Sequence, residues 1–327
     1  MMNRPAKSLA RLSEVCRLAP RFAAWAGGAR SDWFRGIHNP LSSAPGGPGP
    51  WMLVMALFGW MAGMGCRPVE PVSSRPLIVV SVPPQAYFVE QLAGDLVTVA
   101  VMIPPGASPA LYEPTFDQMK ALSHATLYIK VGHPNFAFER AWLDRIVGQN
   151  PRLKVVDASA HLVAREGDPH VWVSPQCVRC MATNIHESLA AILPDHHPAL
   201  VARLRRFLAD IDDLDADLHQ ILDARPGGKF LVFHPAWGHF ARDYGLEQIA
   251  IEQGSKEPSP DQLAKLIDRA RREDVGVVFV QPQFSRASAE LVAAEMGGRV
   301  VAIDPLERQW PENLRRVAHA FRESLKP

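Results

Sequence analysis

Short apolar runs alternate with amphipathic segments along the chain from Leu77 onward. β-Branched runs that alternate with segments of 3.6-residue periodicity are typical of parallel βαβ units. In the first half of this region, the predicted helices are Gln85–Ala93 and Thr115–Ser123. We therefore predict a first α/β unit whose strands are Leu77–Val82, Leu96–Ile103, Ala125–Val131 and Lys154–Val156.

Leucine and isoleucine then recur at spacings of three and four between Leu200 and Ile221. This periodicity predicts one long helix, which begins near Pro198 and ends before Pro226-Gly227-Gly228. A helix of about 28 residues is roughly 42 Å long at 1.5 Å per residue. Because this length exceeds a small domain, the helix suits a strut that joins two lobes.

The alternation of apolar runs and amphipathic segments restarts after the long helix. The pattern predicts an α/β fold with two lobes, each a four-stranded, mainly parallel sheet flanked by helices. We expect an N-terminal lobe over residues 76–194, a connecting helix over 195–226 and a C-terminal lobe over 227–327. The second set of strands is Phe230–Phe233, Gln248–Glu252, Val275–Val280 and Arg299–Ile303, and its helices are Trp237–Tyr244, Pro260–Arg272, Ala287–Met296 and Glu312–Leu325.

Residues 1–75 do not follow this pattern. Scattered basic residues and a Gly/Pro/Ser stretch precede an apolar run of about 15 residues, which is short for a membrane span and typical of a signal peptide. The run ends at Cys66 and resembles a bacterial lipoprotein signal with Cys66 lipidated, although Gly63 stands where leucine or valine is usual. The alternative is an uncleaved anchor helix. Either way, we expect the folded part in the periplasm or at the outer face of the cytoplasmic membrane.

The amino-acid composition excludes two classes of protein. The chain of 327 residues has 35 basic and 34 acidic residues, so it lacks the basic excess of a nucleic-acid-binding protein. Its four cysteines are too few for a disulfide scaffold. Cys177 and Cys180 form a lone CxxC without a second pair, and we predict that they are ordinary residues of a helix from Pro175 to about Leu193.

Histidine and aspartate follow the predicted strands in both halves of the chain. Ligands of open parallel sheets bind outside the carboxyl ends of the strands. His133 and His170 lie at such ends in the first half, and His234 and Asp304 in the second. Four ligands of this kind suit a first-row metal, zinc above all.

Six phrases run in order over about residues 77–325 and read YEPTFDQMKALSHATLYIKVG, DPHVWVSP, FHPAWGHFARDYGL, KEPSPDQLAKLI, VVFVQPQFS and AIDPL. Together they resemble the ZnuA/TroA-like substrate-binding proteins, which are the metal-binding solute receptors of zinc/manganese ABC importers. The resemblance implies two lobes bridged by one rigid helix, a metal in the cleft between them, and delivery to a membrane permease.

The resemblance also implies a set of metal ligands. His170, His234 and Asp304 match ligand positions of the family, whereas Ala110 stands where the family usually has histidine. The site therefore has three protein ligands and water, or recruits another side chain.

Three side chains are candidates for this replacement. His133 is the first, because a strand spacing of about 5 Å puts it within reach of the vacant position. Glu113 is the second candidate, and His239, where the family commonly has an aromatic residue, is the third. Glu252 follows the sixth predicted strand, and we expect it to orient a ligand histidine by a hydrogen bond.

Ligation dominated by histidine favours Zn²⁺, whereas Mn²⁺ prefers more oxygen ligands. We therefore predict a non-enzymatic, monomeric receptor that captures zinc, with manganese as the alternative, for an ABC permease. A metal-dependent adhesin or sensor is the main competing function. A zinc hydrolase is less well supported, because no ligand pair has HExxH spacing and no carboxylate is placed as a general base.

Overall fold

The N-terminal lobe is built on a sheet of four parallel strands in the order β2-β1-β3-β4. The structure, a computed structural model, describes residues 75–162, 167–223, 226–252 and 259–325. Val80 of the central strand pairs with Val101 on one side and Ile129 on the other, so apolar β-branched residues stack across the sheet. The strands are β1 (Leu77–Val80), β2 (Thr98–Val101), β3 (Leu127–Lys130) and β4 (Lys154–Asp157).

The C-terminal lobe repeats this topology with parallel strands in the order β6-β5-β7-β8. In both sheets the strand order reverses beside the first strand, and ligands of open α/β sheets bind at such switch points. His133 follows β3 and His234 follows β5, so both lie at these points. The strands are β5 (Lys229–Val232), β6 (Glu247–Ala250), β7 (Val277–Val280) and β8 (Arg299–Ala302).

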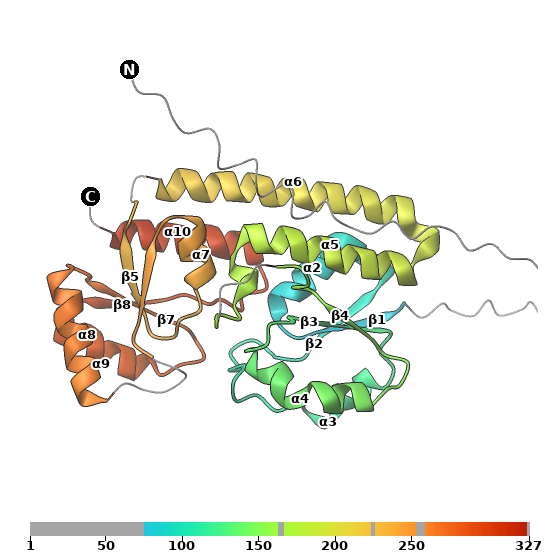
Figure 1. Ribbon diagram of the computed structural model, residues 1–327, viewed down its shortest axis with the longest axis horizontal. Helices are drawn as coiled ribbons and strands as arrows, with labels where there is room; N and C mark the ends of the chain where they lie inside the picture. The colour runs from blue at the N-terminus through green and yellow to red at the C-terminus, as the bar shows by residue number, and fades with distance from the viewer. Residues whose placement is uncertain (1–74, 163–166, 224–225, 253–258, 326–327) are drawn as a thin grey trace, which may run out of the picture. The chain divides into compact units, whose positions relative to one another are not determined.

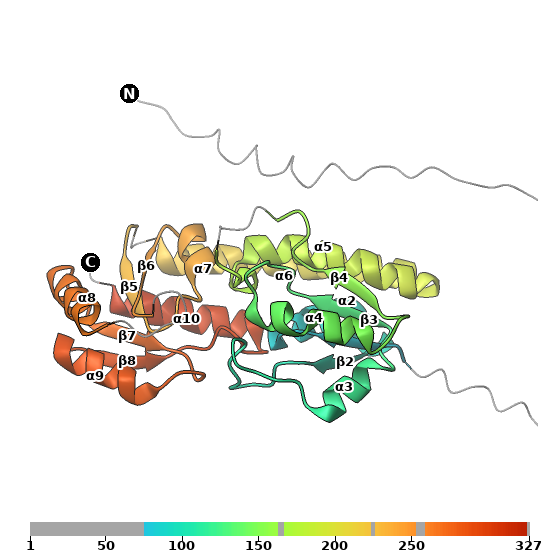
Figure 2. The same cartoon turned by 60° about the horizontal axis from the view of Figure 1, so that its bottom comes forward.

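Helices flank the sheets, and the long helix α6 (His197–Leu222) runs past both lobes (Figures 1 and 2). α5 and α10 pack against α6. The other helices are α2 (Pro83–Ala93), α3 (Phe116–Leu122), α4 (Ala137–Gly148), α5 (Pro175–Ile192), α7 (Gly238–Asp243), α8 (Pro260–Arg272), α9 (Arg286–Met296) and α10 (Trp310–Ser324).

The predicted strut is confirmed as α6, a helix of 26 residues that is about 39 Å long at 1.5 Å per residue. Pro198 lies in its first turn, where the missing backbone N–H costs no hydrogen bond. The side chains that it buries recur at spacings of seven, four and three residues, which keep them on one face: Leu200, Phe207, Ile211, Leu214, Leu218 and Leu222. This stripe packs into a hydrophobic cluster that contains residues of both sheets, so α6 shares one core with the two lobes.

The predicted fold class is confirmed, and all strands in both sheets are parallel. Most observed strands, such as β1 and β2, are shorter than predicted because residues beyond their ends, such as Val82 and Ile103, are buried without belonging to the sheet. The sequence pattern also missed α4. Phe136 is the N-cap of this helix and provides no side-chain cap, so the usual start signal is absent.

Within the described residues, no helix combines the length and the apolar character that crossing a membrane requires. The apolar run that ends at Cys66 lies outside the described residues. The predicted lipidation of Cys66 therefore stays a prediction. The domain boundaries expected at residues 75, 194 and 226 also stay predictions.

Candidate metal centre

His170 lies in a short turn that is held by its own neighbour in the sequence. It follows Asp168-Pro169 and precedes a single 3-10 turn, Val171–Val173. The Nδ1 atom of His170 lies 2.8 Å from Oδ1 of Asp168, and this oxygen also accepts the backbone N–H of His170 at 3.0 Å. Because the carboxylate only accepts hydrogen bonds, it fixes the proton on Nδ1. The remaining ring nitrogen, Nε2, is then the atom that can bind a metal.

The electrostatics of this pair favour a neutral imidazole beside an anionic carboxylate. Burial raises the pKa of Asp168, but hydrogen bonds from His170 and the nearby imidazoles outweigh burial and hold the pKa at about 2. Burial lowers the pKa of His170, and the Asp168 carboxylate opposes this shift only in part. At pH 7 the imidazole is therefore unprotonated at Nε2, which is the form that binds metal ions.

His234 has the same arrangement at the carboxyl end of β5. Its Nδ1 atom contacts Oε2 of Glu252, which follows β6. The side chain of Gln281 holds the backbone of His234 by two hydrogen bonds. Its amide nitrogen donates to the carbonyl of His234 at 2.7 Å, and its amide oxygen accepts the backbone N–H of His234 at 3.3 Å. The ring stacks on Phe284 with 4.8 Å between centroids. His234 is thus fixed in position with Nε2 as its remaining nitrogen.

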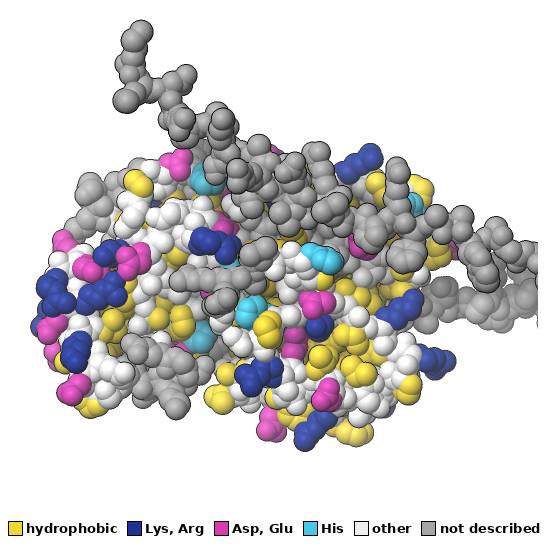
Figure 3. All heavy atoms as spheres, viewed as in Figure 1, with side chains coloured by type: hydrophobic (Ala, Val, Ile, Leu, Met, Phe, Trp, Pro, Cys, Tyr) yellow, Lys and Arg dark blue, Asp and Glu magenta, His cyan; other side chains and the backbone are white. Residues whose placement is uncertain are grey.

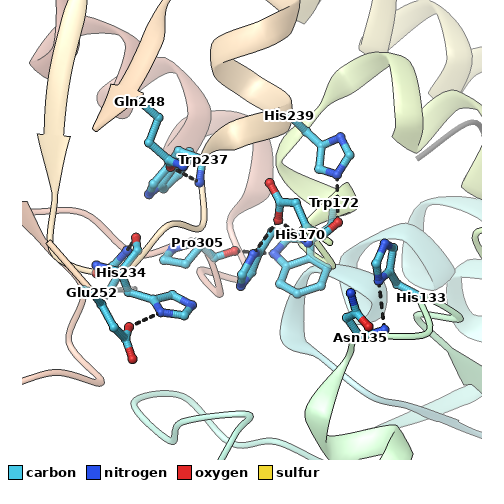
Figure 4. A network of polar contacts seen from close by, with 12 residues as sticks. His133, Asn135, His170, Trp172, His234, Trp237, His239, Gln248, Glu252 and Pro305 are labelled. Atoms are coloured by element: carbon cyan, nitrogen blue, oxygen red, sulfur yellow. Dashed lines mark hydrogen bonds and ion pairs between the residues drawn. The ribbon is translucent and has the colours of Figure 1, made fainter. Parts of the chain in front are cut away.

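The two imidazoles lie close together although they are 64 positions apart in the sequence. Their centroids are 5.3 Å apart and their planes are 82° apart. Figure 4 shows the rings next to each other, with Glu252 on the far side of His234. Two imidazoles on one tetrahedral ion, with metal–nitrogen bonds of about 2.0–2.1 Å, have centroids about 5 Å apart. The spacing of this pair therefore fits a shared zinc ion.

Asp304 follows β8, as the sequence predicted, and lines a pocket of about 220 Å³ with Arg316 and Asn313. Its Oδ1 atom accepts the backbone N–H of Leu306 at 2.9 Å and the amide of Gln283 at 3.1 Å. Burial is the main reason that its pKa is raised, and hydrogen bonds oppose this shift. One carboxylate oxygen is thus already engaged with donors of its own lobe.

The three candidates for the position of Ala110 lie in different surroundings. His133 is 6% exposed, and its Nδ1 atom accepts the backbone N–H of Asn135 at 3.1 Å. Figure 4 shows it well apart from the pair of His170 and His234. Glu113 and Ala110 are exposed on the loop between β2 and α3. His239 is fully buried in α7.

The structure thus brings two of the predicted ligands together. Among the described residues, no three His, Cys, Asp or Glu side chains lie close enough to hold one ion. On the face shown in Figure 3, histidine side chains reach the surface near the line where the two lobes meet. The larger ligand set, with Asp304 and His133, stays a prediction.

Sequence reasoning assigned no role to Asp168, Gln281 or Gln283, although each holds a candidate ligand. The signal for Asp168 is its spacing, because an aspartate two residues before a histidine can accept both the ring and the backbone N–H. The glutamines follow β7 and reach across to neighbouring strand ends, which the sequence alone does not reveal. Cys177 and Cys180 lie on α5, the helix in which the sequence placed them.

Comparisons with known proteins agree on one family. Residues 78–324 match the family model described as ZnuA, zinc-uptake complex component A, periplasmic. A crystal structure of ZnuA has a TM-score of 0.74 and 41% sequence identity, and the match covers 76% of this chain and 98% of that one.

Two curated relatives are named as metal-binding lipoproteins. The zinc-binding lipoprotein AdcA of Streptococcus pneumoniae is 24% identical to this chain, and the match covers 76% of this chain. The same match covers only 54% of the length of AdcA. The manganese-binding lipoprotein MntA of Halalkalibacterium halodurans is 25% identical over 64% of this chain and 71% of its own length. Relatives named for zinc and for manganese thus both resemble this chain.

Proposed function

This chain belongs to the family of zinc-uptake component A proteins, the ZnuA family, and we propose that it captures zinc outside the cytoplasmic membrane for the permease of an ABC importer. One observation carries this proposal: the imidazoles of His170 and His234 lie 5.3 Å apart, each with a carboxylate on Nδ1. A carboxylate on one nitrogen makes the other a better ligand and fixes its direction.

Zinc is the metal that this arrangement favours. Two neutral imidazoles are borderline-soft ligands, which suit zinc better than manganese, whereas oxygen ligands suit manganese. We propose Asp304 and His133 for the remaining positions, with Glu113 or water in place of His133 as the alternative. Each additional oxygen ligand would shift the preference of the site towards manganese.

The family supports a proposal for the location and the partner of this chain. Its members are solute-binding receptors described as periplasmic, and two relatives are named lipoproteins. We propose that Cys66 is lipidated and holds this chain, as a monomer, at the outer face of the cytoplasmic membrane. The loaded receptor would then dock on the permease and release the ion.

The test is a calorimetric titration of the metal-free full-length chain with zinc and, separately, with manganese. The wild type is compared with His170→Ala, His234→Ala, Asp304→Asn and His133→Ala. His319→Ala is the matched control, because His319 is an exposed histidine of α10. We expect tight zinc binding in the wild type and the control, and loss of binding without His170 or His234.

The other two variants locate the remaining ligands. Weaker zinc binding in His133→Ala supports His133 as the replacement for the missing family histidine. Undiminished affinity in that variant rejects this assignment. If the wild type bound neither metal at micromolar concentrations, the proposed function itself would be wrong.

A further inference from the structure

The segment that carries His170 belongs to the N-terminal half of the chain but is bonded to the C-terminal lobe. The ring nitrogen of Trp172 donates to the carbonyl of Pro305 at 2.7 Å, and Trp310 donates to the carbonyl of Trp172 at 2.7 Å. Ser174 contacts the carboxylate of Asp243 in α7. All of these partners lie beyond β5, so the segment is fixed to the lobe that carries His234.

His239 makes another contact of this kind, to the residue that binds His170. Its Nε2 atom lies 3.0 Å from the backbone carbonyl oxygen of Asp168. A carbonyl oxygen only accepts hydrogen bonds, so Nε2 of His239 carries the proton and donates. Asp168 in turn binds the ring and the backbone of His170. A chain of hydrogen bonds thus runs from α7 through Asp168 to His170 (Figure 4).

We propose that His239 is a positioning residue for metal capture, which holds the Asp168–His170 turn on the C-terminal lobe so that His170 and His234 form a preassembled pair. This inference rests on the proposed function of the protein as a metal receptor. It gives His239 a different task from that of a metal ligand.

The surroundings of His239 support positioning over ligation. The side chain is fully buried in α7, and its Nε2 atom is used by Asp168. The other ring nitrogen, Nδ1, is buried without a hydrogen-bond partner among the described atoms. Binding a metal through Nε2 would break the bond to Asp168 and release the turn that orients His170.

The unpartnered Nδ1 atom makes the proposal testable without loss of the fold. Replacing His239 by phenylalanine removes one hydrogen bond but also removes a buried acceptor that has no partner, and these effects oppose each other. The stability of the metal-free protein should therefore change little, whereas the orientation of His170 should suffer. For a residue with only a structural role, the same substitution would lower the stability of the metal-free protein and leave the orientation of His170 unchanged.

The experiment compares zinc affinity, the absorption spectrum of the cobalt-substituted protein and the urea midpoint of the metal-free, full-length chain. The variants are His239→Phe, which has no donor, and His239→Gln, whose amide nitrogen can donate from about the same place. His186→Phe is the matched control, because His186 is also buried with an unpartnered Nδ1 atom and lies on α5.

We expect His239→Phe to weaken zinc binding about 10-fold, the low end of the effect of losing a direct partner of a metal ligand, because His239 acts on His170 through Asp168, and to change the cobalt spectrum. His239→Gln should restore most of the affinity, and His186→Phe should bind as the wild type does. Unchanged affinity and an unchanged spectrum in His239→Phe would overturn the inference, as would His239→Gln binding no better than His239→Phe. Absence of zinc binding in the wild type would instead refute the proposed function.

Discussion

Two indole N–H groups donate to backbone carbonyls across the two halves of the chain, Trp172 to Pro305 and Trp310 to Trp172. Replacing Trp310 by phenylalanine tests how much its hydrogen bond stabilises the fold. Trp310 is 2% exposed at the start of α10, and its Nε1 atom donates to the carbonyl of Trp172. Its ring packs edge-on against Phe88, with centroids 5.2 Å apart. A phenyl ring keeps most of that aromatic contact but cannot donate.

The expected loss has two parts. Leaving the buried carbonyl of Trp172 without its donor costs about 1–3 kcal/mol. The phenyl ring is smaller than the indole and buries about two fewer carbon atoms, which costs about 1.5 kcal/mol at ~0.8 kcal/mol per methylene. We therefore expect Trp310→Phe to lower the free energy of unfolding by about 2.5–4.5 kcal/mol, because both losses destabilise the folded state.

Urea unfolding of the metal-free chain, followed by circular dichroism, measures this difference without depending on tryptophan fluorescence. Trp142→Phe is the matched control, because Trp142 is half-buried and its ring contacts the guanidinium of Arg145 at 4.9 Å. That contact contributes about 0.5–1 kcal/mol at an exposed site. If the two variants lost stability equally, the hydrogen bond from Trp310 would contribute nothing and the reasoning would fail.

Three further predictions concern single side chains. Glu252→Gln should weaken zinc binding about 10-fold, because His234 loses an anionic partner but keeps an acceptor, and an unchanged affinity in calorimetry would contradict this. Gly132→Ala should lower the urea midpoint, because Gly132 has φ 88° and an added Cβ would lie 1.8 Å from Oδ1 of Asp157; a wild-type midpoint would refute the clash. Burial raises the pKa of Glu139 above 4.5, so its stabilising contribution is present below that pH and is lost as pH rises through the folded-state pKa. Glu139→Gln should therefore remove this contribution to the fall in unfolding free energy as pH rises above 4.5, and an unfolding free energy with the same pH dependence as the wild type would refute this cause.

The fold could be predicted because its signals are local. Apolar β-branched runs give the strands, and spacings of three and four from Leu200 to Leu218 give α6. The ends of the strands were predicted less accurately. Val82 is as buried as a strand residue but is the N-cap of α2, and burial alone does not separate a central strand from the loop that follows it.

The candidate site could be predicted only in part, because its partners come from separate segments of the chain. A histidine after a strand is visible in the sequence, as is the motif that contains His170. The contact of His239 with the carbonyl of Asp168 is not visible, because a backbone carbonyl carries no signature in the sequence. Likewise, the sequence does not show which oxygen of Asp304 is engaged by Gln283.

Chain order assigns His170 to the N-terminal lobe, whereas the hydrogen bonds of its neighbours Asp168 and Trp172 place it with the C-terminal lobe. If His170 and His234 move together, a rocking of the lobes leaves the distance between them unchanged. Opening of the lobes would then change only the distance from this pair to ligands elsewhere in the N-terminal lobe. His133 is the ligand that we propose there. We therefore expect His133→Ala to speed zinc release with little effect on the pair, and stopped-flow transfer to a chelator measures this rate. A release rate equal to that of the wild type would show that the lobes do not control the ion through His133.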